Sequence, residues 1–427
     1  IMATQYWLAP TIGPLLAVMA ALLGALWLPW GWACHRLLAG KITVGRTLAA
    51  IVVLPSAWIA AESVRSWQSL GGPWALLGAS QWNQPATLAS AAIGGVWLTG
   101  FLIVAVNTAV TALILHRAWG GRLITLVVAV ACAAVGPLWF AFGPVPAPAP
   151  TVRVALVQPG NIVDAGARQA AGEAITASLA GQHVDLVVWG ESSVGTDLTS
   201  HPEALAHLTA LSRQVGADLL VNVDAPAPNG SIYKSSVLIG PNGSLGSYEK
   251  TRLVPFGEYV PLRPLLDWIT SHTRAAAVDR RRGAELTVLN DGPLTIGPLI
   301  SFEATFSDMP RREVQLGARI IAYQSSTSTF QGSWAQPQLA AEAAVHAVEV
   351  GHPVVHAGLS GDSAAFDSRG RLLAWRPSTF QGAVIVNVPL DSETTPYQRL
   401  GEWMLAVAWS ILACGAAFTT VRRRVVR

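Results

Sequence analysis

The amino-acid sequence predicts a polytopic α-helical membrane domain joined to one α/β domain. Of the 427 residues, 52% are hydrophobic and 12% are charged, whereas soluble domains carry about 25% charged residues. The apolar residues gather toward the two ends of the chain, and the middle has the mixed composition of a soluble domain. These two observations predict that membrane helices flank a water-exposed domain.

Five stretches predict membrane-spanning helices, because each approaches the 20 or so mostly apolar residues that a span requires. They are residues 11–33, 47–62, 87–115, 122–142 and 402–421, of which the second is the shortest. We therefore expect N-terminal transmembrane helices over 1–142. We also expect a C-terminal transmembrane helix over 400–421, with a cytoplasmic basic tail at 422–427.

Basic residues beside these stretches predict their orientation, since Lys and Arg accumulate in short cytoplasmic loops. Such residues lie at 35–46, 116–122 and 422–427. Alternation then places the N-terminus and residues 143–400 on the opposite side, so the α/β domain is expected to be extracytoplasmic. An N-terminus on that side normally needs a preceding apolar segment, so we expect further helices upstream of this sequence.

The middle of the chain predicts a layered α/β domain over 152–392. A proline-rich stretch at 143–151 predicts an extended linker before it. Short runs rich in Val, Ile and Leu then alternate with helical patterns, at 152–159, 184–192, 217–224, 294–304, 318–326, 353–358 and 382–388. Buried strands separated by helices indicate sheets that are covered by helices.

The net charge argues against nucleic-acid binding, and the spacing of cysteines and histidines argues against a metal site. The net charge is only +3 and much of the basic excess lies beside the spans, so we expect no nucleic-acid partner. The three cysteines lie far apart in or beside apolar segments, and the nine histidines lack ligand spacing. His352 and His356 are four residues apart but have no zinc-protease glutamate between them. We therefore expect no metal and no cofactor.

Three segments of the α/β domain end in a side chain that can carry chemistry. Glu191 follows an apolar run, Lys250 precedes a loop with Pro and Gly, and Ser301 ends another run. Such strand ends can converge at one edge of a sheet, where α/β sites are built. A lone charged residue usually lies on the surface, but Lys250 is one of only three lysines, with Lys41 and Lys234.

The sequence KTRLVPFGEYVPL at 250–262 resembles the signature of the apolipoprotein N-acyltransferase family. GGPWALLGASQW at 71–82 is similar to a loop in the membrane domain of that family, and the resemblance runs from about residue 60 to the end. It implies a nitrilase-like carbon-nitrogen hydrolase domain, an αββα sandwich, held at the bacterial plasma (inner) membrane.

The resemblance also implies ping-pong acyl transfer through a covalent acyl-enzyme. A phospholipid, taken from the membrane lipid, would donate an acyl chain to the nucleophile. The α-amino group of a diacylglyceryl-modified lipoprotein would then accept it. The general base would be Glu191, Lys250 would stabilise the oxyanion, and Ser301 stands at the nucleophile position. Three further positions match residues that support the site of the family, namely Glu258, Phe302 and Glu303.

The family has cysteine where this chain has Ser301, and no cysteine lies between 133 and 413. A serine hydroxyl is far less acidic than a thiol, and serine nucleophiles normally rely on a His or Lys base. Tyrosine is replaced by Phe302, an Asn-Asp-Ala-Trp stretch by 326–329, and two arginines by His352 and His356. So many departures favour a divergent paralogue over an engineered Cys→Ser change.

Three hypotheses therefore remain open from the sequence. The first is an acyltransferase, of the lipoprotein type or with another acceptor. The second is a catalytically inactive homologue that binds lipid or lipoprotein and partners an active enzyme. The third is a membrane-tethered amidase that uses water as the acceptor, which the match in the membrane domain disfavours.

Overall fold

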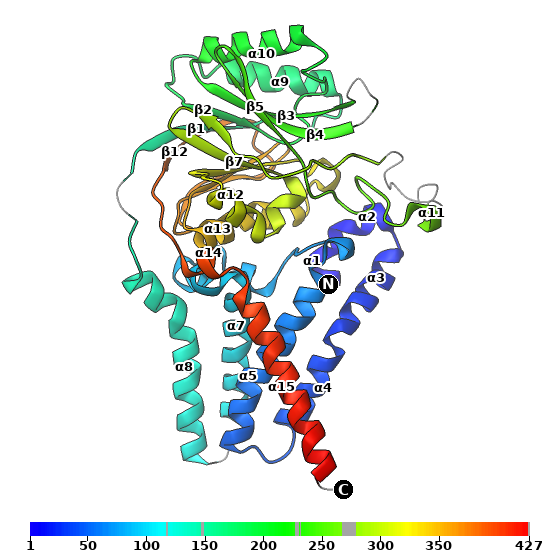
Figure 1. The fold of residues 1–427 in the computed structure, drawn as a ribbon, viewed down its shortest axis with the longest axis vertical. Helices are drawn as coiled ribbons and strands as arrows, with labels where there is room; N and C mark the ends of the chain where they lie inside the picture. The colour runs from blue at the N-terminus through cyan, green and yellow to red at the C-terminus, as the bar shows by residue number, and fades with distance from the viewer. Residues whose placement is uncertain (117, 147–148, 227–229, 231, 267–278, 426–427) are drawn as a thin grey trace. The chain divides into compact units, whose positions relative to one another are not determined.

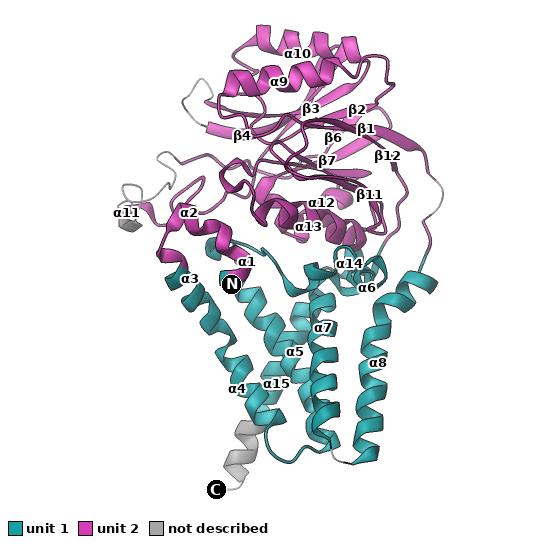
Figure 2. Ribbon diagram, turned by 180° about the vertical axis from the view of Figure 1, so that it is seen from behind, with its two compact units in different colours: residues 1–2, 17–144, 395–427 teal, residues 3–16, 145–394 magenta. Residues whose placement is uncertain are grey.

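The structure is a computed structural model of the chain (Figure 1). It describes residues 1–116, 118–146, 149–226, 230, 232–266 and 279–425. The chain divides into two compact units, which Figure 2 shows in different colours. The helical unit comprises Ile1–Met2, Ala17–Pro144 and Thr395–Arg427, and the α/β unit comprises Ala3–Leu16 and Val145–Thr394.

The helical unit is built from long apolar helices. Among the described residues, four segments are long and apolar enough to cross a membrane: Leu15–Leu38, Val44–Arg65, Ala91–Leu115 and Trp119–Phe142. The first contains α3 (Leu15–Gly24) and α4 (Leu28–Leu38), and the others are α5, α7 and α8. A single-turn helix, α6 (Pro85–Leu88), precedes α7. The four N-terminal stretches predicted from the sequence are thus confirmed as apolar helices, with different boundaries.

The helix α5 extends three residues beyond the predicted 47–62 at each end. The helix begins at Val44, where the Thr43 side chain accepts a hydrogen bond from the backbone N–H of Arg46. It continues to Arg65 because its charged end is buried and paired: Glu62 is 4% exposed, and its Oε1 accepts the N–H of Leu77 at 2.9 Å. A hydropathy pattern ends at such a charge, but a hydrogen-bonded helix need not.

The C-terminal part contains α14 (Pro396–Leu400) and α15 (Trp403–Val425). The apolar stretch of α15 is Trp403–Phe418, which is shorter than the four segments above. That α15 spans the membrane stays a prediction. Residues 147–148 of the predicted linker and 426–427 of the predicted tail lie outside the described residues.

Two six-stranded sheets form the centre of the α/β unit. The first has the order β12-β1-β2-β3-β4-β5 and the second β11-β10-β9-β8-β7-β6. Strands β1, β2 and β3 are parallel to one another, as are β7, β8 and β9. The first sheet contains β1 (Thr151–Gln158), β2 (Leu186–Trp189), β3 (Asp218–Pro226), β4 (Ile232–Gly240), β5 (Gly243–Glu249) and β12 (Gly382–Pro389). The second contains β6 (Leu289–Asp291), β7 (Leu294–Ile300), β8 (Ile320–Ser325), β9 (Val354–Gly358), β10 (Ser363–Phe366) and β11 (Leu372–Arg376).

Alternate side chains of these strands enter two different cores. Leu156 and Val188 of the first sheet share one cluster with Ile296 and Val355 of the second, so this core lies between the sheets. The intervening side chains, such as Val187, face the helices instead. Figure 1 shows the resulting layers. The outer layers are α9 (Ala165–Ala177) and α10 (Pro202–Val215) on the first sheet, and α12 (Asp308–Gln315) and α13 (Ala335–Val350) on the second. The αββα sandwich that the resemblance implies is confirmed.

The α/β unit also includes short helices from two other parts of the chain. They are α1 (Met2–Gln5), α2 (Ala9–Ile12) and α11 (Arg263–Leu266). The N-terminal segment packs on the loop before α13, where the Trp7 ring lies 4.7 Å from that of Phe330 and its Nε1 donates to Gln338 Oε1.

Candidate active site

Carboxyl ends of strands from both sheets meet at one edge of the α/β unit. Glu191 lies two residues beyond β2, and its backbone N–H donates to Ser325 O at the end of β8. The loop at Leu359 donates to the same oxygen. A Cβ on Gly190 would lie 2.3 Å from Leu359 N, so only glycine allows this close approach before Glu191. The packing of strand ends therefore places Glu191 at the edge that the sequence predicts.

Lys250 lies between two carboxylates at this edge. Its Nζ is 2.9 Å from Glu258 Oε1 and 3.4 Å from Glu191 Oε1. Lys250 is 1% exposed, Glu191 3% and Glu258 4%, so the three charges are removed from bulk water. The second Glu191 oxygen, Oε2, accepts the backbone N–H of Ser326 at 3.0 Å. The structure thus brings together three of the residues predicted from the sequence.

A second lysine, Lys234 of β4, joins this cluster. Its Nζ lies 2.6 Å from Glu191 Oε1, 3.3 Å from Glu258 Oε1 and 3.6 Å from Asp224 Oδ2. Asp224 in turn pairs with Arg280 at 3.2 Å. Sequence reasoning noted Lys234 only as one of three lysines. The rarity of lysine in the chain was the sequence signal that could have pointed to Lys234. Its partners come from other segments, so no local motif contains them.

Burial and ion pairing shift the pKa values of this cluster in opposite directions. For Glu258, burial favours the neutral acid, but Lys250, Lys234 and the N–H of Val254 outweigh it and lower the pKa to about 2. For Lys234, burial is likewise outweighed, by Glu191 first and then by Glu258 and Asp224, so its pKa is raised. Both groups are therefore charged at neutral pH.

Ser301 directly follows β7 and begins the short 3₁₀ helix Ser301–Thr305. Its φ of 53° lies in the left-handed region, which non-glycine residues seldom adopt. Ser301 is half-buried, whereas the next residue, Phe302, is 2% exposed. A sharp turn from a strand into a helix exposes the side chain at the turn. Strained backbone of this kind is frequent at functional sites.

Replacing Ser301 with glycine tests this backbone strain. Glycine adopts a positive φ without a Cβ clash, so the Ser301→Gly variant should be more stable than Ser301→Ala by about 1 kcal/mol. The midpoints of chemical unfolding of the two variants check this expectation. Equal midpoints, or a less stable glycine variant, would mean that the turn carries no strain.

Glu303 ties the Ser301 turn to the segment that follows Lys250. Its Oε1 accepts the backbone N–H groups of Thr251 at 2.8 Å and Arg252 at 2.9 Å, and the Tyr248 hydroxyl at 2.6 Å. Its Oε2 accepts the N–H of Ile300 at 2.9 Å. Glu303 is fully buried and burial raises its pKa, but these donors and Lys250 oppose the rise. One carboxylate therefore holds the lysine segment and the serine turn together.

Known protein families match both parts of this chain. The family model for the N-terminal domain of apolipoprotein N-acyltransferases matches residues 1–109, and the carbon-nitrogen hydrolase model matches residues 153–396. A protein named apolipoprotein N-acyltransferase in Azotobacter vinelandii is 31% identical over 402 residues, which cover 89% of this chain and 75% of the relative. The chain belongs to the apolipoprotein N-acyltransferase family.

Other relatives with the same name agree over most of their length. The Methylococcus capsulatus protein is 30% identical, covering 87% of this chain and 74% of the relative. The Vibrio vulnificus protein is 28% identical, covering 92% and 78%. With the four apolar helices, these relatives indicate a bacterial membrane protein.

Solved nitrilase-superfamily structures resemble the chain more distantly. A member from Saccharomyces cerevisiae is 18% identical with a TM-score of 0.42, covering 56% of this chain and 90% of that one. An amidase from Nesterenkonia is 18% identical with a TM-score of 0.43, covering 60% and 99%.

The positions that the sequence resemblance implies as departures from the family pattern, which stay a prediction, lie in different places. Ser326 is at the site, through its hydrogen bond to Glu191. His356 is fully buried on β9, hydrogen-bonded to Ser325 Oγ, and burial lowers its pKa to about 3, so it is neutral. His352 lies in the turn after α13 and its Nδ1 pairs with Val350 O. Phe302 packs edge-on against Phe306 at 5.0 Å. Neither His352 nor Phe302 joins the ion cluster.

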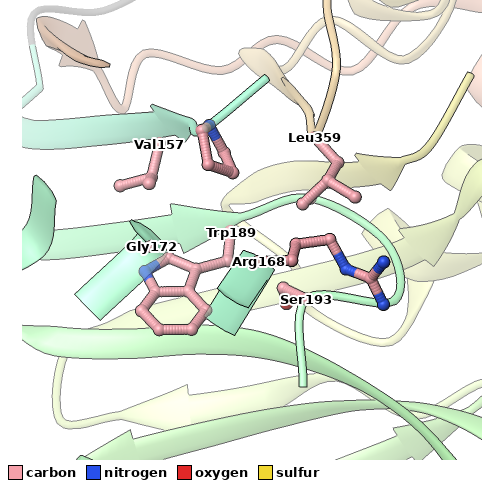
Figure 3. Close-up of a pocket in the computed structure, with 8 residues that line it drawn as sticks. Val157, Arg168, Gly172, Trp189, Ser193 and Leu359 are labelled. Carbon is pink, nitrogen blue, oxygen red and sulfur yellow. The ribbon is translucent and has the colours of Figure 1, made fainter. Parts of the chain in front are cut away.

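A small hollow lies on the helix side of β2 (Figure 3). Trp189, Arg168 and Leu359 line it, and its interior has no room for a water molecule. Arg168 is already committed, because its Nε donates to Ser192 O and its Nη1 to Ile162 O. This hollow is therefore no substrate site. Over the described ranges, no group of three His, Cys, Asp or Glu residues could hold a metal ion.

Proposed function

We propose that this protein N-acylates lipoproteins at the outer face of the bacterial plasma (inner) membrane. The donor is a phospholipid, and the acceptor is the α-amino group of a diacylglyceryl-modified lipoprotein. The observation that carries the proposal is the buried Glu191–Lys250–Glu258 cluster, which Glu303 ties to the Ser301 turn. The relatives that share the name apolipoprotein N-acyltransferase support the same substrates.

In the proposed first step, Ser301 Oγ attacks the ester carbonyl of the phospholipid. Its proton passes to Glu191, and Lys250 stabilises the oxyanion as an ammonium ion. The carbon–oxygen bond to the glycerol then breaks, and the lysophospholipid leaves with the proton from Glu191. In the second step the lipoprotein amine attacks the oxyester and loses a proton to Glu191. The bond to Ser301 Oγ then breaks as the amide forms, and Glu191 returns the proton to Oγ.

Orientation is part of this proposal. The basic loops at 35–46 and 116–122 are expected in the cytoplasm, which places the residues after α8 outside. Acceptor lipoproteins and outer-leaflet phospholipids are then available to the α/β unit without crossing the membrane.

The second candidate is a non-catalytic homologue that binds lipid or lipoprotein and partners an active enzyme. Two observations favour it. The nucleophile position holds a hydroxyl of low acidity. In addition, Lys234 donates a hydrogen bond to Oε1 of Glu191, the same oxygen that accepts from Lys250. This candidate predicts binding without turnover.

Intact-protein mass spectrometry after incubation with phospholipid vesicles tests the two candidates. The native chain and Ser301→Cys should gain the mass of one acyl chain, with the cysteine form reacting faster, while Ser301→Ala gains none. Peptide mapping separates an adduct at 301 from adducts on Cys34, Cys132 or Cys414. A diacylglyceryl lipopeptide with a free amine should then remove the adduct. No adduct in any form would overturn the acyltransferase proposal and leave the binding protein.

A further inference from the structure

Lys234 lies closer to the proposed general base than Lys250 does. Its Nζ is 2.6 Å from Glu191 Oε1, against 3.4 Å for Lys250. We propose that Lys234 is a positioning residue that keeps the Glu191 carboxylate ionised and so restrains its exchange of protons with the nucleophile. This inference rests on the proposed function and adds a residue that acts on the base through its charge.

The sheet fixes Lys234 at this point. It pairs with Asp224 across the antiparallel β3–β4 ladder, and its carbonyl accepts the backbone N–H of Lys250 at 2.8 Å. The two lysines of the α/β unit are therefore bound to each other through the backbone. Lys234 is 9% exposed, so its ammonium cannot turn to solvent without leaving buried carboxylates behind.

The hydrogen bonds of Glu191 show how the Lys234 ammonium acts on its carboxylate. Oε1 accepts from Lys234 and Lys250, and Oε2 accepts from Ser326 N. To take a proton, Glu191 must become neutral beside the two lysines. A nearby opposite charge stabilises the ionised carboxylate and lowers its affinity for a proton. The closer ammonium, Lys234, exerts the larger share of this effect.

Removing Lys234 still leaves each carboxylate of the cluster with at least one cationic partner. Counted together with Glu191, the charged groups of this cluster in the described residues balance, with three carboxylates and three cations: Glu191, Asp224, Glu258, Lys234, Lys250 and Arg280. Without Lys234, Asp224 keeps Arg280, while Glu191 and Glu258 share Lys250. Lys234→Met keeps the length of the side chain without its charge, and Lys234→Arg keeps a charge. Lys41→Met, at an exposed lysine of the helical unit, is the matched control.

The direct test measures the protonation of Glu191 by infrared difference spectroscopy during an acid titration of the full chain in lipid nanodiscs. The protonated carboxyl band of Glu191 is the one lost in Glu191→Gln. In Lys234→Met this band should appear at a pH higher by about one unit or more than in the native chain. Lys234→Arg and Lys41→Met should follow the native chain. A band at the same pH in the methionine and native forms, or no band before acid unfolding in the methionine form, overturns the inference.

The rate of acyl adduct formation gives the functional test in the Ser301→Cys background. Lys234→Met should raise this rate several-fold at neutral pH and move the acidic limb of its pH profile to higher pH, while Lys234→Arg does neither. An unchanged or lower rate with the methionine variant contradicts the restraint. If no variant forms an adduct, the proposed function fails, and the infrared titration still decides the role of Lys234.

Discussion

Replacing Lys250 with methionine is expected to destabilise the α/β unit by about 3–5 kcal/mol and to abolish adduct formation at Ser301. Its ammonium is almost fully buried and lies 2.9 Å from Glu258 and 3.4 Å from Glu191. Removing one partner of a buried ion pair leaves uncompensated charge, which costs more than the intact pair contributes. Lys234 would remain as the only lysine for two buried glutamates in the described cluster. Thermal and chemical unfolding of the variant in nanodiscs measures the loss.

The pH dependence of this loss has a definite sign. The folded pKa of Glu258, about 2, lies below its ordinary value of 4.5. Its ionised pairing therefore contributes stability above pH 4.5, and this contribution disappears as the pH falls toward 2. The deficit of Lys250→Met should be largest near neutral pH and should shrink in acid.

Lys41→Met provides the control for this measurement, because Lys41 is exposed in the helical unit. It should unfold like the native chain at every pH. If Lys250→Met also unfolds like the native chain at pH 7, Lys250 is not needed to neutralise the buried glutamates. Retained acyl transfer in that variant would remove its role at the oxyanion.

The architecture was largely predictable because the sequence patterns that identify membrane helices and buried strands are both local. Apolar runs of span length identify α3–α4, α5, α7 and α8, and short apolar runs identify the parallel strands β1–β3 and β7–β9 together with β12. The strands that were not predicted carry weaker signals. β5, for example, reads GSLGSYE and forms a ladder with β4 on one side, so pairing rather than composition determines it.

The candidate site was predictable only where residues end strands or lie in the 250–262 motif. Glu191, Lys250 and Glu258 meet in one ion cluster, while Glu303 joins the chain segments on either side. Lys234 escaped prediction because its contacts cross three strands and a loop that are far apart in sequence. Such non-local pairing leaves no trace in a single sequence.

A buried carboxyl group on α12 predicts a second pH effect, of opposite sign. Glu313 is fully buried, and neither of its oxygens has a hydrogen-bond partner among the described atoms. Burial, and then the nearby charge of Glu303, raise its pKa to about 8. The folded protein therefore keeps this proton to a higher pH than the unfolded chain, whose glutamate ionises near 4.5. Stability falls as the pH rises from 4.5 to 8.

Glu313→Gln should remove this fall, because a neutral amide of the same shape has no proton to lose. Relative to the native chain, the variant should gain stability progressively between pH 4.5 and 8, by up to about 5 kcal/mol. Melting temperatures at pH 5.5 and 8.5 measure the difference, with Glu285→Gln, at an exposed glutamate of the same unit, as the control. If Glu313→Gln and Glu285→Gln lose the same stability between these pH values, Glu313 is not the group that titrates. A gain confined to Glu313→Gln would show that the fold keeps Glu313 as a neutral acid, since ionising it would set a second buried carboxylate against Glu303.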